Sequence, residues 1–561
     1  MSTTLDFADV RDWLVRPRAD KGIRFLADDG TWDYHSYADL ALAARRSATA
    51  MTAAGARPAD VVCLLMPTSY PTLCAYFGAW AAGLTPCMIT PPSFAGSAEY
   101  VELVSGILRR AQPVLMVTTE RYQEVADLAL VAADLPGRAF SHGQAEEPIE
   151  VPKAGPDDLA ILQFTSGSTG VPRGVPVTWQ NLAVNISCTR AWSEWAEDDS
   201  MASWLPLYHD MGLIGTLLAT VCSQADLWLM QPAQFLRDPG RWLECMTRAT
   251  ITAAPPFAYE YAAQRVAAER IVGWDLSGWR TAFVGAQTID PEVLDTFVEA
   301  TAVAGFDRTA LTPAYGMAET TLGVTATDPG VAPLVVRVGP DGLRFGHQVT
   351  LTRQFHLGEE PVPARSGWLT GCGGPRLGTR IGIVDGDGVE LPPGHLGEIR
   401  VSGETVTSGY TNDAGSGGTR FTPDGLRTGD AGFLHDGQLF VLGRMGDSLK
   451  VRGRTVYVED LEAAVVEATG LSISRCVVIS APETDRAGVL LLVEGRHHGW
   501  RDAAYQALRS RLGDEPRIRF ALGGNGLIQH TTSGKPRRRR MWQHLQEGTL
   551  DATIVEPGVP A

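Results

Sequence analysis

Lysine is scarce in this sequence, and positive charge does not predominate in it. Only four of the 48 basic residues among its 561 positions are lysine, namely Lys21, Lys153, Lys450 and Lys535. The net charge of −16 argues against a general nucleic-acid binder, because such binding depends on a cationic surface, so we expect no nucleic-acid partner. Where arginine supplies generic charge, a retained lysine serves as a compact point charge with three donors, which directs attention to Lys450 and Lys535.

The sequence also lacks long apolar runs, paired cysteines and a leader-like beginning. Its longest apolar patches, such as residues 75–84, are too short to span a membrane, and no basic segment precedes an apolar core near the first residue. We therefore expect no membrane span, no signal peptide and a cytoplasmic location. None of the eight cysteines forms a Cys-x-x-Cys pair and no cysteine–histidine cluster has zinc spacing, so we expect reduced thiols that lie mostly in the core.

The length and the order of apolar segments predict more than one domain, since 561 residues are too many for a single core. Strand and helix signals alternate first, which is typical of a parallel sheet with helices on both faces. Short strands with much glycine and proline follow, and then α and β signals on a smaller scale. We expect an α/β fold in which an N-terminal domain (1–445) of parallel α/β sheets carries a β-rich subdomain (about 330–445). A hinge would join it to a small mobile α+β C-terminal domain (446–561).

Individual elements are predicted from the spacing of apolar residues. Helices are expected at residues 39–54, 71–82, 100–110, 458–468 and 503–511. Strands are expected at residues 61–66, 85–90, 114–118, 159–164, 227–230, 251–254, 281–284, 379–384, 398–401, 438–442, 475–480 and 489–493.

A loop of small residues follows the apolar segment at 159–164, and consists of Thr165, Ser166, Gly167, Ser168, Thr169 and Gly170. Small residues let the backbone approach an anion closely, and hydroxyl and N–H groups can then bind phosphate oxygens. A strand followed by such a loop is where an α/β protein holds a nucleotide phosphate. The chain continues with Pro172-Arg173-Gly174, so this is no Walker A loop, which ends in Gly-Lys-Ser/Thr. The alternative is a Ser/Gly-rich surface turn.

Further motifs follow this loop in order. They are PLYHDMGLIG at 206–215, VGAQTI at 284–289, AYGMAET at 314–320, TGD at 428–430, GRMGDSLKVRG at 443–453 and TTSGKPRR at 531–538. Together with TSGSTGVPRG at 165–174, this series resembles the adenylate-forming superfamily of acyl-CoA synthetases, luciferases and peptide-synthetase adenylation domains, from about residue 30 to residue 540. The resemblance implies that a carboxylate and ATP give acyl-AMP and pyrophosphate, after which the acyl group passes to a thiol. The cofactors implied are ATP and Mg²⁺.

The resemblance implies a nucleotide-binding role for residues of several motifs. The loop at 165–170 and Arg173, where the family more often has lysine, would hold the β- and γ-phosphates. Tyr315 would stack on adenine. Asp430 would accept hydrogen bonds from the ribose hydroxyls, and Arg444 would contact the ribose and the phosphates. The walls around adenine would be completed by Gly285, Ala286, Gln287 (in place of the more usual glutamate), Ala314, Gly316 and Ala318.

The resemblance also implies which residues act on the reacting groups. Attack of a carboxylate on the α-phosphate builds up negative charge, so positioned donors and cations are needed. Glu319 would ligate Mg²⁺, which prefers such an oxygen ligand. Lys535 would bridge the α-phosphate and the substrate carboxylate, with Arg444 as a further catalytic residue. Asp447 lies at the hinge position, and Lys450 is expected to be structural or close to the ribose.

Two of the motifs favour one branch of this superfamily. PLYHDMGLIG and AYGMAETTLG resemble the fatty acyl-AMP ligases, which pass a fatty acid to the phosphopantetheine thiol of an acyl carrier protein rather than to coenzyme A. The long connection at 337–368 is consistent with the insert by which that branch limits movement of its C-terminal domain. His209 would lie at the mouth of the acyl pocket with Trp204 nearby. On charge alone, the arginines at 537–540 are hypothesised to meet an acidic carrier protein; the alternative is a solvated positive tail.

Two other functions stay open at this point. An acyl-CoA synthetase would have the same active site and would differ in its thiol acceptor. A degenerate nucleotide sensor would need no catalytic groups, and the retention of Glu319, Asp430, Arg444 and Lys535 argues against it.

Overall fold

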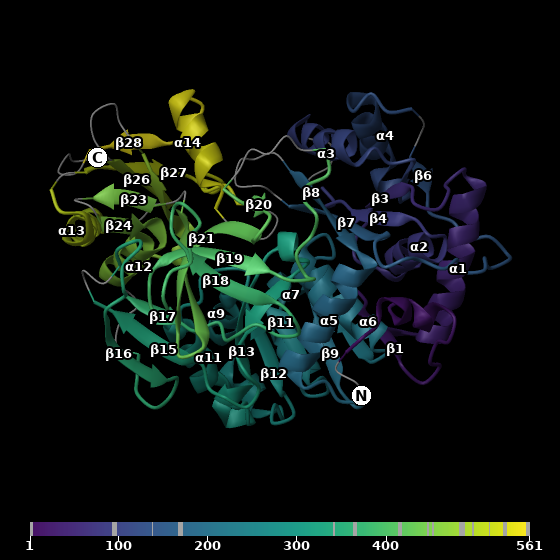
Figure 1. The fold of residues 1–561 in the computed structure, drawn as a ribbon, viewed down its shortest axis with the longest axis horizontal. Coiled ribbons are helices and arrows are strands. Elements are labelled where there is room, and N and C mark those ends of the chain that lie inside the picture. The colour runs from purple at the N-terminus through teal and green to yellow at the C-terminus, as the bar shows by residue number, and fades with distance from the viewer. Residues whose placement is uncertain are drawn as a thin grey trace.

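The structure of the protein is a computed structural model. It describes residues 4–92, 98–136, 139–165, 172–339, 343–362, 367–412, 418–445, 448–451, 454–481, 488–495, 499–514, 516–530 and 536–556. In Figure 1 the N-terminal elements, purple to teal, form the larger part, and the last strands and helices, yellow-green to yellow, gather at one end of it. The β-rich elements, in green, lie next to this end.

An eight-stranded sheet forms the centre of the large α/β part. Its order is β14-β13-β12-β11-β9-β10-β1-β2, and neighbours pair in parallel except at the two edges, β13–β14 and β1–β2. Every side chain of β11 (Ile251–Ala254) and β12 (Thr281–Val284) is buried, as expected for central strands of a covered sheet. The remaining strands are β1 (Gly22–Leu26), β2 (Trp32–Ser36), β9 (Ser200–Ser203), β10 (Asp226–Leu229), β13 (Leu311–Gly316) and β14 (Gly323–Ala326).

A second sheet, of order β4-β3-β5-β6, is parallel throughout. A capping box of Ser36 and Asp39 begins α1, and α1 approaches α2 at Gly78, where an added Cβ would lie 2.9 Å from the Cβ of Ser47. The predicted alternation and the α/β fold class are confirmed. The elements are β3 (Val61–Leu65), β4 (Thr85–Met88), β5 (Leu115–Thr118), β6 (Phe140–Ser141), α1 (Tyr37–Ala53), α2 (Tyr70–Ala81), α3 (Ala98–Ala111) and α4 (Gln123–Ala132).

The strand before the small-residue loop belongs to a separate hairpin. β7 (Leu159–Thr165) pairs antiparallel with β8 (Arg173–Thr178), so that Thr165 lies opposite Arg173. The loop therefore joins two antiparallel strands, whereas in βαβ nucleotide sites such a loop leads into a helix. Helix α5 (Trp179–Ser193) begins only after β8, at Thr178, whose hydroxyl accepts a hydrogen bond from the Asn181 N–H.

Two antiparallel sheets make up the β-rich part. The first has the order β16-β15-β17, and the second has the order β18-β19-β21-β20 with β22 paired to β21. The long connection at 337–368 contains β16, which pairs antiparallel with β15. The strands are β15 (Leu334–Val338), β16 (Leu351–His356), β17 (Trp368–Thr370), β18 (Arg380–Val384), β19 (Gly397–Ser402), β20 (Arg420–Thr422), β21 (Gly425–His435) and β22 (Gln438–Arg444).

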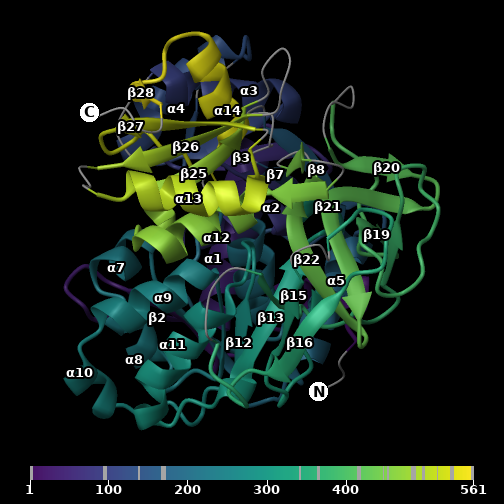
Figure 2. The ribbon, with the colours of Figure 1, turned by 90° about the vertical axis from the view of Figure 1, so that its left-hand side faces the viewer.

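The C-terminal elements have apolar clusters of their own. Two clusters of buried residues draw, among the described residues, only on positions after 446. In Figure 2 these elements lie together beside β21, with α12 on their lower side. The division at 445/446 itself stays a prediction. The elements are β23 (Ser448–Val451), β24 (Arg454–Tyr457), α12 (Val458–Thr469), β25 (Cys476–Ser480), β26 (Gly488–Glu494), α13 (Arg501–Leu512), β27 (Arg517–Gly523), α14 (Arg538–Gln546) and β28 (Thr553–Val555).

Shorter helices surround the eight-stranded sheet. A π-helix (Met211–Leu218) and α9 (Pro256–Arg265) are the ones that bear on the site below; the others are α6 (Ala219–Cys222), α7 (Pro232–Arg237), α8 (Gly240–Cys245), α10 (Ala268–Val272) and α11 (Pro291–Thr301). In the part of the chain that the structure describes, none of the helices combines the length and the apolar character that crossing a membrane requires.

Candidate active site

A cavity of about 800 Å³ lies where the ends of β12 and β13 meet the β-rich part. The carboxyl ends of neighbouring parallel strands share one edge of a sheet, which is where α/β proteins bind ligands. Residues 285–290, directly after β12, and residues 314–319, at the end of β13, line the cavity. Ala286 and Thr321 both have a φ of 68°, in the left-handed region. Such strained backbone is concentrated at functional sites.

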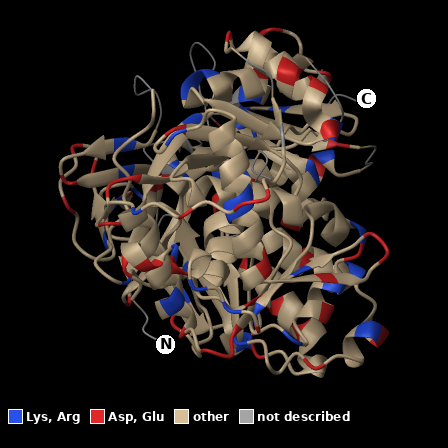
Figure 3. Ribbon diagram, turned by 90° about the vertical axis from the view of Figure 1, so that its right-hand side faces the viewer, with Lys and Arg blue, Asp and Glu red and all other residues tan. Residues whose placement is uncertain are grey.

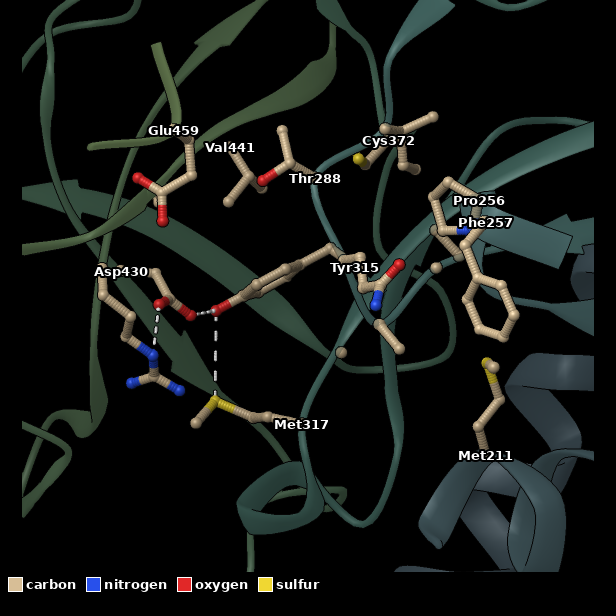
Figure 4. A pocket seen from close by; sticks show the side chains of 18 of the residues that line it. Met211, Pro256, Phe257, Thr288, Tyr315, Met317, Cys372, Asp430, Val441 and Glu459 are labelled. Atoms are coloured by element: carbon tan, nitrogen blue, oxygen red, sulfur yellow. Dashed lines mark hydrogen bonds and ion pairs between the residues drawn. The ribbon is translucent and has the colours of Figure 1, made fainter. Parts of the chain in front are cut away.

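Three hydrogen-bonded side chains occupy one side of the cavity. Tyr315 donates its hydroxyl to Asp430 Oδ2 at 2.6 Å, and Arg444 Nε lies 2.9 Å from Asp430 Oδ1. Arg444 also donates to the carbonyl oxygen of Thr428 at 2.8 Å. Figure 4 shows Tyr315 crossing the middle of the cavity toward Asp430. Burial and the Asp430 carboxylate raise the pKa of Tyr315, so its hydroxyl stays a donor, and the carboxylate keeps lone pairs for a ligand.

Glu319 is buried in the cavity wall beside an aromatic ring and a guanidinium. Glu319 is only 5% exposed to solvent. Tyr410 donates its hydroxyl to Glu319 Oε1, and Arg173 Nη2 lies 3.9 Å from the same oxygen. The Arg173 guanidinium also lies 4.0 Å from the centre of the Tyr410 ring, a cation–π arrangement. A backbone hydrogen bond of 2.8 Å from Thr411 to Gly174 holds these neighbours side by side.

The sequence did not single out Tyr410 as a site residue. It stands in the segment TSGYTN at 407–412, which has no motif of its own, and the one available signal was an aromatic residue in a turn of small polar residues. Burial and the Glu319 carboxylate raise the pKa of Tyr410, so this hydroxyl also stays protonated and donates.

Two polar atoms at the base of the small-residue loop are buried without a partner among the described residues. They are Thr165 Oγ1 and Arg173 Nε, which belong to residues paired across the β7–β8 hairpin. Both residues line the cavity. A buried donor without a partner costs free energy that a bound acceptor recovers. Phosphate oxygens are such acceptors, so the donors fit the phosphate site that the sequence predicts here.

The cavity brings together every predicted nucleotide or metal residue that the structure describes. Its lining includes Thr165, Arg173, Gly285, Ala286, Gln287, Ala314, Tyr315, Gly316, Ala318, Glu319, Asp430 and Arg444. The remaining calls, which lie outside the described residues, are Ser166, Gly167, Ser168, Thr169, Gly170, Asp447 and Lys535. Pro536, which follows Lys535 in the sequence, lines the same cavity.

Trp204 is not among the residues that line the cavity, and its place near the mouth of an acyl pocket stays a prediction. Its ring is buried and stacks on Phe235, with 3.9 Å between centroids, and it meets Phe257 edge-on at 5.9 Å. A large aromatic side chain gains much from burial against other rings, and here that contact places it in the core. Phe257 takes the position at the cavity wall, and Trp204 supports it from behind.

The far side of the cavity is apolar. Met211 and Phe257 point toward each other there, at the opposite end from Asp430 (Figure 4). Phe283 of β12 also lines the cavity. His209 also lines the cavity, as expected, and its Nδ1 lies 2.8 Å from Asp210 Oδ1.

The described side chains of Arg537, Arg538 and Arg540 are half-buried and do not form an open positive tail. The Nη2 of Arg538 contacts both oxygens of Glu462, at 2.8 and 2.9 Å, while its Nη1 lies 3.4 Å from Glu459 Oε1. Burial lowers the pKa of Arg537. Arg540 Nη2 lies 3.6 Å from Glu99 Oε1, so the first turn of α14 comes near the first turn of α3. Basic and acidic residues are interspersed along the ribbon in Figure 3, and Arg538 cannot serve an external acidic partner while it binds Glu462.

Comparisons with known proteins identify the family to which the chain is similar. The family model described as AMP-binding enzyme matches residues 15–411. Long-chain-fatty-acid–AMP ligase FadD26 of Mycobacterium marinum is 31% identical over 89% of this chain and 89% of its own. A putative acyl-CoA synthetase of Caulobacter vibrioides is 33% identical over 91% of this chain and 90% of its own. A solved structure from a study of fatty acyl-adenylate ligases from E. coli and L. pneumophila superposes with a TM-score of 0.85, at 27% identity over 98% of each chain.

Proposed function

Because the chain belongs to the family of AMP-binding enzymes, we propose that it activates a fatty or related carboxylic acid with ATP and passes the acyl group to the phosphopantetheine thiol of a holo acyl carrier protein. The chain is an acyl-adenylate-forming ligase with fatty acyl-AMP ligases among its relatives. One observation carries the proposal: a single cavity has charged and hydroxyl side chains at one end and an apolar wall at the other. A nucleotide and an apolar acid would meet in it.

The polar end suits a nucleotide in three respects. Tyr315 presents a ring in the middle of the cavity for an adenine to stack on. Asp430, oriented by Tyr315 and Arg444, offers a carboxylate to the two ribose hydroxyls. Thr165 and Arg173 offer unpaired donors to the terminal phosphates.

Glu319 fits a magnesium ion bound together with phosphates. Magnesium is usually held by one or two carboxylates, with waters and substrate phosphates completing its shell. Within the described ranges, no group of three or more histidine, cysteine, aspartate or glutamate side chains forms a complete protein cage, so Glu319 would act as a single ligand. A bound magnesium ion would neutralise charge that develops on the phosphates.

The reaction would use these groups in two steps. A carboxylate oxygen of the acid would attack the α-phosphorus, and the bond to the pyrophosphate oxygen would break while Arg173 and Thr165 hold the leaving phosphates. Lys535 and Arg444 would stabilise the charge on the α-phosphate. The thiol would then attack the acyl carbon and release AMP. Between the steps, residues 446–561 would turn about Asp447 and withdraw Lys535.

Replacing Tyr410 with phenylalanine is expected to raise the Mg²⁺ concentration needed for half-maximal activity about threefold to tenfold, the effect of one lost hydrogen bond. Phenylalanine keeps the ring beneath Arg173 but removes the hydrogen bond to Glu319 Oε1. The freed carboxylate can then turn toward the Arg173 guanidinium 3.9 Å away, and it would bind the metal ion less tightly. Magnesium titration of ATP–pyrophosphate exchange measures this. An unchanged titration curve would show that Tyr410 does not position Glu319.

The proposed function is tested by one assay in two stages. ATP–pyrophosphate exchange over a panel of carboxylic acids tests activation, and the acyl-AMP is then offered either a holo carrier protein or coenzyme A. We expect acid-dependent exchange, and faster acyl transfer to the carrier protein. Exchange without any dependence on acid would refute activation.

The similarity to a putative acyl-CoA synthetase makes coenzyme A the second candidate acceptor. The two acceptors present the same phosphopantetheine thiol, so the active site serves both. Rapid formation of acyl-CoA, with no preference for the carrier protein, would overturn the carrier-protein proposal and leave the activation step intact.

A further inference from the structure

Part of the cavity lining comes from α5, the π-helix and the segment that begins just before β14, and we call this part the branch. Its lining residues are Thr189, Trp192, Met211, Gly215, Leu322, Gly323 and Thr325. Met211 faces Phe257 across the cavity (Figure 4). An acid whose carboxylate lies near the phosphates would extend its chain in this direction.

The walls of the branch come into contact at two glycines. A Cβ added at Gly323 would lie 2.9 Å from Trp192 Cζ3, and a Cβ added at Gly215 would lie 2.7 Å from Leu322 Cδ2. Side chains of these two neighbours therefore pack directly on bare backbone. The indole of Trp192 occupies the space next to Gly323 that a side chain at that position would otherwise take.

Trp192 is held in this position from both ends. The edge of its six-membered ring rests on Gly323, and its Nε1 donates to the carbonyl oxygen of Gly374 at 3.2 Å. Gly374 is itself paired with Ala326, the last residue of β14, by two backbone hydrogen bonds. The indole thus lies across β14 and is 2% exposed. A ring that is hydrogen-bonded and packed in this way keeps one conformation and does not move aside for a ligand.

We propose that Trp192 sets the maximum length of the acid that the enzyme activates, and that the enzyme prefers acids of medium length to long ones. The inference rests on the proposed function, since it concerns the acid of that reaction. An acid long enough to reach the indole fills the branch, and further methylenes have no apolar surface left to bury. Specificity in such a pocket comes from the loss of that burial and from steric exclusion.

The test compares ATP–pyrophosphate exchange by the wild type and by Trp192→Ala with hexanoate, decanoate, myristate and stearate. The wild type is expected to prefer decanoate to stearate. In Trp192→Ala the optimum moves to longer acids, because each methylene that enters the new space lowers KM about fourfold. Trp192→Phe, which keeps a ring but loses the Nε1 donor, should shift the optimum less. Trp192→Phe is also the second variant in case Trp192→Ala does not fold. Thermal unfolding with and without ATP shows whether each variant is folded and still binds ATP.

A matched variant elsewhere in the cavity lining distinguishes the alternative path. Leu369 and Val338 line the cavity from the β15–β17 sheet. If the acyl chain runs there, Leu369→Ala changes the length profile and Trp192→Ala does not, and the inference is overturned. It is also overturned if the wild type uses stearate as well as decanoate. Failure of every acid to support exchange would instead refute the proposed function itself.

Discussion

Replacing Lys535 with alanine is expected to lower acid-dependent ATP–pyrophosphate exchange by about 10²- to 10³-fold, the loss typical when one donor to developing charge is removed. The sequence motif assigns this lysine to the α-phosphate and the acid carboxylate, and the next residue, Pro536, lines the cavity. ATP affinity should change little, because Asp430 and Arg444 are unaffected. Exchange kinetics together with calorimetric titration of a non-hydrolysable ATP analogue separate the two effects.

Two further variants make this result specific. Lys153→Ala removes an exposed lysine and should leave exchange unchanged. Lys535→Arg keeps the charge but replaces a compact ammonium with a planar guanidinium, and we expect most of the activity to be lost. Full activity of Lys535→Arg would mean that any cation suffices. Full activity of Lys535→Ala would remove the residue from the mechanism.

Replacing Glu319 with glutamine is expected to lower exchange about 10²-fold or more. The amide has nearly the same shape and still accepts the hydrogen bond from Tyr410, so packing is preserved while the negative charge near the phosphates is lost. Without that charge the site would hold Mg²⁺ weakly, and higher Mg²⁺ should recover part of the rate. Exchange measured over a range of Mg²⁺ concentrations tests both statements.

The control for this variant is Glu404→Gln, which removes an exposed carboxylate in the segment that precedes Tyr410. It should have wild-type activity and the same dependence on Mg²⁺. If Glu319→Gln loses activity to the same small extent as Glu404→Gln, general electrostatics and not metal binding explain the effect. Thermal unfolding of both variants should be close to that of the wild type.

The α/β fold followed from the sequence because its strands are buried on both faces. Segments such as residues 251–254 and 281–284 are short apolar runs without polar alternation, and they became the central strands β11 and β12. The hairpin of β7 and β8 was not anticipated, because a strand before a glycine-rich loop is equally compatible with a following helix. Pairing of the segments on either side of the loop decides between a hairpin and a following helix, and the pattern of apolar residues in one segment does not reveal that pairing.

The candidate site shows the same limit at the level of single residues. Tyr315, Glu319 and Asp430 stand in motifs, and their neighbourhood in space could be expected from the resemblance. Tyr410 and Glu319 are 91 positions apart in the sequence, so no local pattern predicted their contact. Trp204 lies only five positions before His209, yet the two side chains have different surroundings. The Trp204 indole stacks on Phe235 and is buried in the core.

The β7–β8 hairpin has a consequence for how the loop between its two strands can change during evolution. By backbone pairing, its two strands form a two-stranded sheet of their own among the described strands, and an isolated bridge connects Gly174 to Thr411, which lies outside the named strands. Residues gained or lost in the loop would therefore leave the register of both parallel sheets untouched. The proposed phosphate-binding loop can therefore vary in length and sequence during evolution, while the sheets that carry the proposed adenine and ribose residues keep their register.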